Sequence, residues 1–312
     1  MVTLKANGIE DRAIIALDAG VEVSQTTLRS SVKLMGVGLH TGRDTSVTIH
    51  PASENSGIVF TDGKKQVRAL AENVIDTSRG TTIGLNGTRV RTVEHLMSAL
   101  RGMGVDNALI EVDGSEMPAL DGSAGPYVEA IDSVGLEKSD AKRQRVVIDH
   151  PVCAQQGDSF ILAVPSDELR FTYVMRYDHP MIGVQMSSYV LNEDDYGAEI
   201  AVARTFVLYE EVAGLLDMEL ARGGSLDNVI VVWQDKVSSA LRYPDEFVRH
   251  KVLDMVGDLA LVGGLLQADI LAVKSGHTLN VELANRIRRA AQDSGDAGLI
   301  EDIGQSSWRQ CG

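Results

Sequence analysis

One local pattern occurs twice along the chain, and it constrains the fold more than any other feature. In each half, short strand-like segments lead to a helix that contains the sequence Val-x-His, at residues 93–95 and 248–250. A glycine follows each histidine by seven residues, Gly102 and Gly257, and an apolar strand comes next. The repetition predicts a duplicated α+β unit. Two such units that pack helix layer against helix layer would bring the two histidines together.

The second of these helices carries two different stripes of side chains. Its apolar stripe consists of Val248, Val252, Met255 and Leu259. A polar stripe has His250, Asp254 and Asp258 at positions i, i+4 and i+8, with Lys251 beside it. A core-facing helix rarely has three ionisable groups in one line unless they are paired, exposed or bound to a metal. A solvated polar face is the alternative interpretation.

The two repeated histidines and one carboxylate of the polar stripe form a candidate metal site. His95, His250 and Asp254 would supply two imidazoles and one carboxylate. This ligand set is typical of hydrolytic zinc, which keeps one position open and lowers the pKa of a bound water to about 7. Glu94 directly precedes His95 and could act as the general base. Taken alone, an acidic residue in a first helical turn is explained by the helix dipole.

Four further residues are candidates for work around the reacting centre. His277 stands just before a predicted helix and could donate a proton, and Asp258 could orient it. Thr205 and Lys251 could donate hydrogen bonds to a developing oxyanion. Each has an ordinary alternative, since His277 alone is most simply a capping or surface histidine.

Charge and cysteine content exclude several classes of function. The net charge of -15 argues against nucleic acid or an anionic membrane as a partner. Cys153 and Cys311 are the only cysteines, so a metal would be held by histidine and carboxylate. The N-terminus does not resemble a signal peptide, and residues 259–273 are too interrupted for a transmembrane helix. We expect a cytoplasmic monomer without an integral membrane segment.

The chain divides into three segments on these patterns. Residues 1–25 are expected to be an N-terminal extension, residues 26–140 the first α+β domain and residues 141–312 the second. The charged residues 137–145 are the predicted linker. Short antiparallel strands are expected before each repeated helix, and residues 194–203 are expected to be helical.

Several stretches, in collinear order from about residue 26 to 280, resemble the UDP-3-O-acyl-N-acetylglucosamine deacetylases. The similar stretches are residues 26–28, 36–42, 92–96, 117–124, 203–206, 223–225, 245–254 and 274–277. This family removes the N-acetyl group of a UDP-linked acyl-glucosamine in the committed step of lipid A biosynthesis and depends on zinc. The resemblance implies a fold of two related α+β domains, each an antiparallel sheet with helices, packed as a layered sandwich with the helices between the sheets.

The resemblance also implies roles for individual residues. It makes His95, His250 and Asp254 the ligands of Zn2+ and Glu94 the general base. His277, oriented by Asp258, would be the second acid or an electrostatic residue. Thr205 and Lys251 would lie at the acetamide oxyanion. The corresponding substrate contacts would be Tyr177 at uracil, and Phe206, Leu208, Val212, Leu215 and Leu216 in residues 206–232, an insert that forms an apolar passage for the acyl chain.

The sequence departs from the family pattern where the substrate is bound. Ser159 stands where some members have a lysine near the nucleotide, and Val207 stands where glycine is usual. The loops after Phe60 and Val237 are shorter than usual. Two alternatives therefore remain: a diverged paralogue that deacetylates another acylated amino-sugar nucleotide, and a catalytically silent sugar-nucleotide binding protein. The presence of both Glu94 and His277 disfavours the silent protein.

Overall fold

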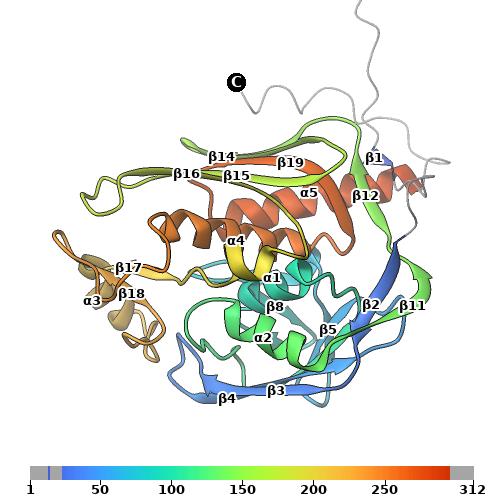
Figure 1. Ribbon diagram of the computed structural model, residues 1–312, viewed down its shortest axis with the longest axis horizontal. Helices are drawn as coiled ribbons and strands as arrows, with labels where there is room; N and C mark the ends of the chain where they lie inside the picture. Colours follow the sequence, from blue (N-terminus) through green and yellow to red (C-terminus); the bar gives the residue numbers. More distant parts are fainter. Residues whose placement is uncertain (1–12, 15–22, 296–312) are drawn as a thin grey trace, which may run out of the picture.

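The structure, a computed structural model, describes residues 13–14 and 23–295 of the chain. Two sheets form the outer layers, and the longest helices lie between them (Figure 1). The α+β layered fold expected from the sequence is confirmed. Among the described residues, none of the helices has the length and apolar character needed to cross a membrane.

The first sheet has five strands in the order β3-β4-β10-β5-β6. These strands are β3 (Val32–Val37), β4 (Asp44–Pro51), β10 (Ala108–Asp113), β5 (Ile58–Thr61) and β6 (Gln66–Arg68). Helices α1 (Glu94–Gly102) and α2 (Gly125–Val134) belong to the same part of the chain. A short 3-10 helix over Ala71–Asn73 and a small sheet of β7 (Val74–Asp76), β8 (Thr82–Leu85) and β9 (Thr88–Val90) come before α1.

The second sheet has seven strands with β19 (Leu265–Val273) at its centre. The other strands are β1 (Ala13–Ile14), β12 (Arg145–Ile148), β13 (Val152–Gln156), β14 (Ser159–Pro165), β15 (Leu169–Arg176) and β16 (Val184–Val190). Helices α4 (Glu246–Ala260) and α5 (His277–Gly295) lie against its inner side (Figure 1).

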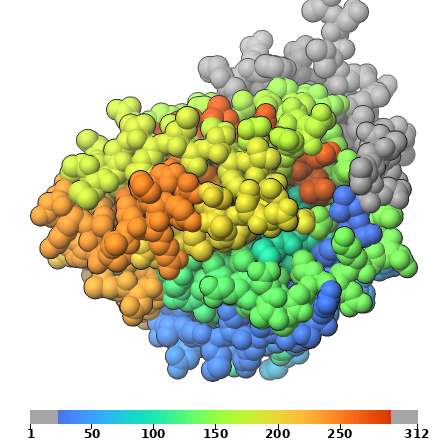
Figure 2. Space-filling view, in the orientation of Figure 1, coloured from blue at the N-terminus to red at the C-terminus, as the bar shows by residue number. Residues whose placement is uncertain are grey.

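The segment from 206 to 232 projects from one end of the layers. It contains β17 (Phe206–Leu208), α3 (Tyr209–Asp217) and β18 (Ile230–Val232), and the two strands pair in parallel. Figure 2 shows this segment as an orange block at one side of the molecule. The helix expected at residues 194–203 is shorter, a π-helix over Gly197–Ala201.

Two expectations about the fold, the linker and the purely antiparallel sheets, need correction. The charged segment predicted as a linker is largely a strand, β11 (Leu136–Lys142), which pairs with β2 (Ser24–Leu28). Side chains that face the solvent on an edge strand can be charged. The charged composition of this segment therefore suggested a linker, although its backbone forms a strand. Within the expected N-terminal extension, Ala13–Ile14 pairs with β12, while residues 1–12 and 15–22 lie outside the described residues.

The sheets are also not purely antiparallel. Strand β5 runs parallel to β10, and β12 and β15 run parallel to β19. Each of these parallel neighbours is separated from its partner by a helix in the chain, as parallel pairing requires. The division into domains at residue 140 stays a prediction, and that residue lies within β11.

The repeated helices α1 and α4 pack directly against each other. At Gly257 a Cβ atom would lie 2.0 Å from the carbonyl oxygen of Glu94, so only glycine permits this approach. The Ser98 hydroxyl donates a hydrogen bond to the carbonyl oxygen of Leu253 at 2.8 Å. Gly257, which follows His250 by seven residues, therefore has a packing role in α4. Its contact with α1 brings the polar faces of the two helices together.

Candidate metal centre

Three buried side chains from α1 and α4 converge on one point. His95 is the second residue of α1, and His250 and Asp254 lie one turn apart on α4. One ligand atom from each lies within 4.8 Å of the others. The two imidazole rings meet edge to face with their centroids 5.1 Å apart. These residues form a group that could hold a metal ion, and the structure brings together all three ligands predicted from the sequence.

The orientation of His250 fits the requirements of a metal ligand. Its Nδ1 lies 3.0 Å from the carbonyl oxygen of Ala203, which can only accept a hydrogen bond. The proton is therefore on Nδ1, and Nε2 keeps its lone pair on the side of Asp254, whose Oδ1 is 3.4 Å away. A carbonyl partner of this kind commonly fixes the tautomer of a metal-binding histidine.

The charge states of the cluster also suit a cation. Burial lowers the pKa of His250 to about 4, against the opposing charge of Asp254. Burial raises the pKa of Asp254, but Lys251 and His250 outweigh it and hold that pKa well below its ordinary value. At neutral pH the site therefore offers a neutral imidazole and a carboxylate, which are the protonation states that metal binding needs.

Glu94 lies beside the three ligands at the start of α1 and is buried. Its Oε2 accepts a hydrogen bond from the backbone N–H of Thr81 at 2.9 Å. Burial raises the pKa of Glu94, against the lowering effects of His277 and His95. A Cβ atom at Gly80 would lie 3.0 Å from Oε1, so this glycine leaves room at the second oxygen. A carboxylate held by one oxygen, with a raised pKa, is suited to accept a proton.

His277 and Asp258 form a hydrogen-bonded pair of titratable side chains in the same site. His277, the first residue of α5, donates from Nδ1 to Asp258 Oδ2 at 2.9 Å. Burial lowers the pKa of His277, but the charge and hydrogen bond of Asp258 raise it, and the result is about 10. The imidazole is therefore protonated at neutral pH. Asp258 also accepts hydrogen bonds from the Thr81 hydroxyl at 2.6 Å and from Asn280 Nδ2 at 2.9 Å.

Sequence reasoning missed Thr81 and Asn280. Thr81 donates from its backbone to Glu94 and from its side chain to Asp258, so it links Glu94 to the His277–Asp258 pair. It lies in the loop before β8, and nothing in its local sequence indicates this contact. Asn280 was in principle detectable, because it lies three residues after His277 and hence on the same face of α5.

One cavity of about 320 Å³ is lined by Glu94, His277 and the three residues that could hold a metal ion. The predicted site residues that line it are Glu94, His95, Tyr177, Thr205, Phe206, Leu208, His250, Lys251, Asp254 and His277. Lys251 donates to Asp254 Oδ2 at 2.9 Å, and its ammonium group lies 5.7 Å from the Phe206 ring centroid. Asp258 lies behind His277. Val212 and Leu215 do not line this cavity, and their role in an acyl passage stays a prediction, as does that of Leu216.

Two contacts join pairs of solvent-accessible residues that line the cavity. Arg79 pairs with Glu211 of α3, with Nη1 and Oε2 2.9 Å apart, and the Thr77 hydroxyl lies 2.8 Å from that of Thr278. Arg79 has a φ of 62°, an uncommon backbone conformation for a residue with a side chain. The Nε2–H of His40 donates to the Arg79 carbonyl oxygen at 3.1 Å and helps to hold this conformation.

Comparison with known proteins gives a consistent result. The family model described as LpxC: UDP-3-O-acyl N-acetylglycosamine deacetylase matches residues 25–289. A UDP-3-O-acyl-N-acetylglucosamine deacetylase from Myxococcus xanthus (strain DK1622) is 44% identical over 272 residues, which cover 85% of this chain and 86% of the relative. Proteins with the same description are 40% identical in Syntrophus aciditrophicus (strain SB), over 84% of this chain and 85% of the relative, and 41% identical in Chlamydia trachomatis serovar D, over 86% and 96%.

Proposed function

Because this chain belongs to the UDP-3-O-acyl N-acetylglycosamine deacetylase family, we propose that it hydrolyses the N-acetyl group of UDP-3-O-acyl-N-acetylglucosamine and releases acetate, the committed step of lipid A biosynthesis. The observation that carries the proposal is the convergence of His95, His250 and Asp254 with Glu94 and His277 around one cavity. One chain supplies all five groups, which supports a monomer.

We infer that His95, His250 and Asp254 hold one Zn2+ ion. Two imidazoles and a carboxylate match the protein ligands of hydrolytic zinc. When bound, the ion would polarise the acetamide carbonyl and lower the pKa of a water molecule. The Ala203 carbonyl contributes by keeping His250 in the tautomer whose Nε2 is free to bind.

Glu94 and His277 perform the proton transfers in this proposal. Glu94 takes a proton from the attacking water as the water oxygen bonds to the acetamide carbon. The π electrons of the carbonyl group move to the acetamide oxygen. Thr205 and Lys251 donate hydrogen bonds to that oxygen. When the oxyanion collapses, the carbon–nitrogen bond breaks, and the imidazolium of His277 protonates the leaving amine. Acetate and the free amino sugar nucleotide are the products.

The rest of the substrate is bound by the insert and by the second sheet. Tyr177, whose ring centroid lies 5.9 Å from that of Phe206, contacts the uracil base. Phe206, Leu208, Val212 and Leu215 lie along the acyl chain. The alternative of a diverged paralogue is favoured in the structure by Val207, which lines the cavity at a position where the family pattern has glycine.

Metal analysis and an acetate assay test the proposal together. The purified protein is expected to contain about one zinc per chain and to release acetate from UDP-3-O-acyl-N-acetylglucosamine. A chelator should remove the activity, and added zinc should restore it. Full zinc content without acetate release, for substrates with every acyl length tried, would contradict the proposed reaction and favour the paralogue or the silent binding protein.

Replacing Val207 by glycine should broaden the acyl chains that are accepted. Removing the isopropyl group from the cavity wall should raise kcat/KM for the longer chains relative to the shorter ones by about tenfold, the effect of one or two methylene groups. Steady-state kinetics on a series of acyl lengths measure this ratio. Val231→Gly makes the same change on the paired strand, at a residue that does not line the cavity, and should leave the ratio unchanged. An unchanged ratio in Val207→Gly would show that Val207 does not limit chain length.

A further inference from the structure

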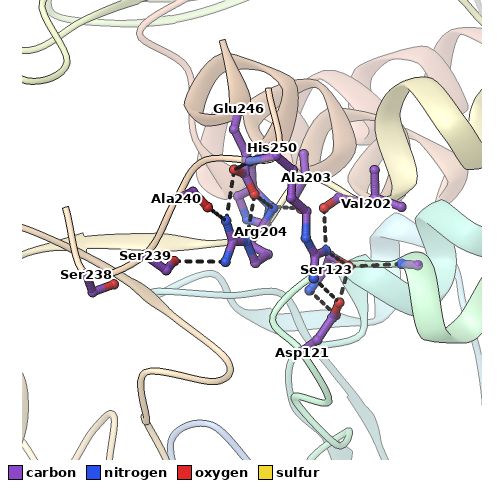
Figure 3. Close-up of polar contacts among 12 residues, drawn as sticks. Asp121, Ser123, Val202, Ala203, Arg204, Ser238, Ser239, Ala240, Glu246 and His250 are labelled. Atoms are coloured by element: carbon purple, nitrogen blue, oxygen red, sulfur yellow. Dashed lines mark hydrogen bonds and ion pairs between the residues drawn. The ribbon is translucent and has the colours of Figure 1, made fainter. Parts of the chain in front are cut away.

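A buried ion pair lies near His250, one residue of the candidate metal centre (Figure 3). Arg204 precedes β17, and Glu246 is the first residue of α4. Their side chains meet in a two-point contact, with Nε 2.8 Å from Oε1 and Nη2 3.1 Å from Oε2. The Glu246 side chain is fully buried and that of Arg204 is 12% exposed. Neither residue has a part in the chemistry described above.

The remaining hydrogen-bonding groups of this pair are also satisfied. Arg204 donates from Nη1 to the Ser239 hydroxyl at 2.9 Å and from Nη2 to the Ala240 carbonyl at 2.8 Å. Glu246 accepts from the backbone N–H of Arg204 at 3.1 Å and from that of Arg242 at 2.6 Å. Burial raises the pKa of Glu246, but these bonds with Arg204 and Arg242 outweigh it and lower the pKa. The pair is therefore charged, and both partners are fixed in one geometry.

The ion pair connects the same two segments as the hydrogen bond that orients His250. Ala203, whose carbonyl accepts from His250, directly precedes Arg204 in the chain. Glu246 lies one helical turn before His250 on α4. The Arg204–Glu246 and Ala203–His250 contacts, together with the chain that joins their residues, therefore form a small closed ring. Figure 3 shows the four residues close together. A displacement of Arg204 would move the Ala203 carbonyl away from His250.

The same segment also places Thr205. Its backbone N–H donates to the Gly122 carbonyl at 2.8 Å, and its own carbonyl accepts from the N–H of Ile230 at 2.9 Å. These bonds determine the path of the chain after Arg204, and the ion pair determines it before Thr205. Thr205 is one of the residues that line the cavity.

We propose that Arg204 and Glu246 are positioning residues for the metal ligand His250 and for Thr205. Their ion pair holds the 203–205 segment against the start of α4, so that the Ala203 carbonyl keeps His250 in its Nδ1–H tautomer. A buried ion pair is often no more stabilising than apolar residues of similar size, so its selective advantage here is orientation. The inference rests on the proposed function, because it assigns His250 to the metal.

The double variant Arg204→Met/Glu246→Leu separates orientation from stability. Removing only one partner would leave the other buried and unpaired, which destabilises strongly, whereas replacing both with apolar groups is often neutral. We expect this variant to fold and to bind zinc about 10–100-fold more weakly in competition with a chelator, as loss of an outer-shell partner does. We also expect kcat to fall at least about tenfold, with KM changed less than about twofold.

The tautomer of His250 gives a readout that does not depend on turnover. In the wild-type protein, the ¹⁵N shifts of the His250 ring should show a single Nδ1–H form, and in the double variant they should show a mixture. Arg204→Lys keeps the charge but not the two-point geometry, so its zinc affinity should lie between those of the wild type and the double variant. If the double variant does not fold, Arg204→Lys alone decides: zinc affinity and ring shifts equal to wild type would overturn the inference.

A matched control lies on the same helix. Arg249 pairs with Glu199 at 2.7 Å near the start of α4, at a more exposed position. Arg249→Met/Glu199→Gln should keep zinc affinity and kcat within about twofold of wild type, since exposed pairs contribute little. Equal losses in this control would overturn the inference, because general anchoring of α4 would then explain them. So would a folded Arg204→Met/Glu246→Leu variant with wild-type zinc affinity and ring shifts.

The proposed reaction and this inference can fail separately. If the wild-type protein binds zinc but releases no acetate, the proposed reaction is wrong, while the chelator competition and the ¹⁵N shifts still decide the positioning role. If the wild type deacetylates its substrate and the double variant is equally active and equally tight for zinc, only the positioning role is wrong.

Discussion

Replacing Glu94 by glutamine is expected to lower kcat by about 10²–10⁴-fold while zinc content stays near one per chain. The amide keeps the size of the side chain and can still accept a hydrogen bond from the Thr81 N–H, but it cannot take a proton from water. Since Glu94 is not one of the three converging ligands, the metal should remain. Acetate release and metal analysis on the same preparation measure both quantities.

The exposed Glu111 provides a control for this change. It pairs with His50 on the outer face of the first sheet, and Glu111→Gln should leave turnover unchanged. A Glu94→Gln protein whose kcat stays within about tenfold of wild type would exclude Glu94 as the base. Loss of zinc from that protein would instead show that Glu94 supports the metal.

Replacing His277 by glutamine is expected to lower kcat by about 10²–10³-fold and to abolish the alkaline limb of the pH–rate profile. Burial lowers the pKa of His277, and Asp258 raises it to about 10 in the metal-free protein. The acid form is therefore present at neutral pH and is lost as pH rises through the folded-state pKa. Bound zinc would repel the imidazolium, so the limb should appear at or below about pH 10. Profiles of kcat from pH 7 upward test this.

Asp258→Asn should move that limb to lower pH, because it removes the negative charge that opposes the effect of burial. A limb at the same pH in this variant would show that another group titrates. The same shift affects stability. Since the pKa is raised on folding, the contribution of His277 is fully present below its unfolded pKa, about 6.5, and is lost as pH rises through the folded value.

The group of residues that could hold a metal ion could be predicted because its geometry is encoded locally. His250 and Asp254 are one turn apart on a single helix, and that spacing alone places them on one face. The third residue of this group, His95, was predicted through the repeated pattern, and the direct packing of α1 on α4 explains why the repetition was informative.

Contacts between distant segments could not be predicted in this way. Thr81 meets Asp258 across 177 positions of the sequence, and Arg204 meets Glu246 across 42. A strand pattern shows which side chains face the core but not which strand lies alongside, so the parallel pairing of β5 with β10 was missed. Charged composition likewise concealed β11, whose backbone pairs with β2 while its side chains remain mostly exposed.

The ion pair between Arg79 and Glu211 is much more exposed than the packing of α1 on α4. Arg79 and Glu211 are 49% and 39% exposed, and a pair of this exposure contributes only about 0–1 kcal/mol to folding. By contrast, α4 meets the start of α1 at the contact of Gly257 with the Glu94 backbone, where any side chain would collide. Substitutions of the exposed residues Arg79 and Glu211 therefore cost little folding free energy. Over evolutionary time, exposed residues that line the cavity can therefore change while the packing of α1 on α4 stays the same.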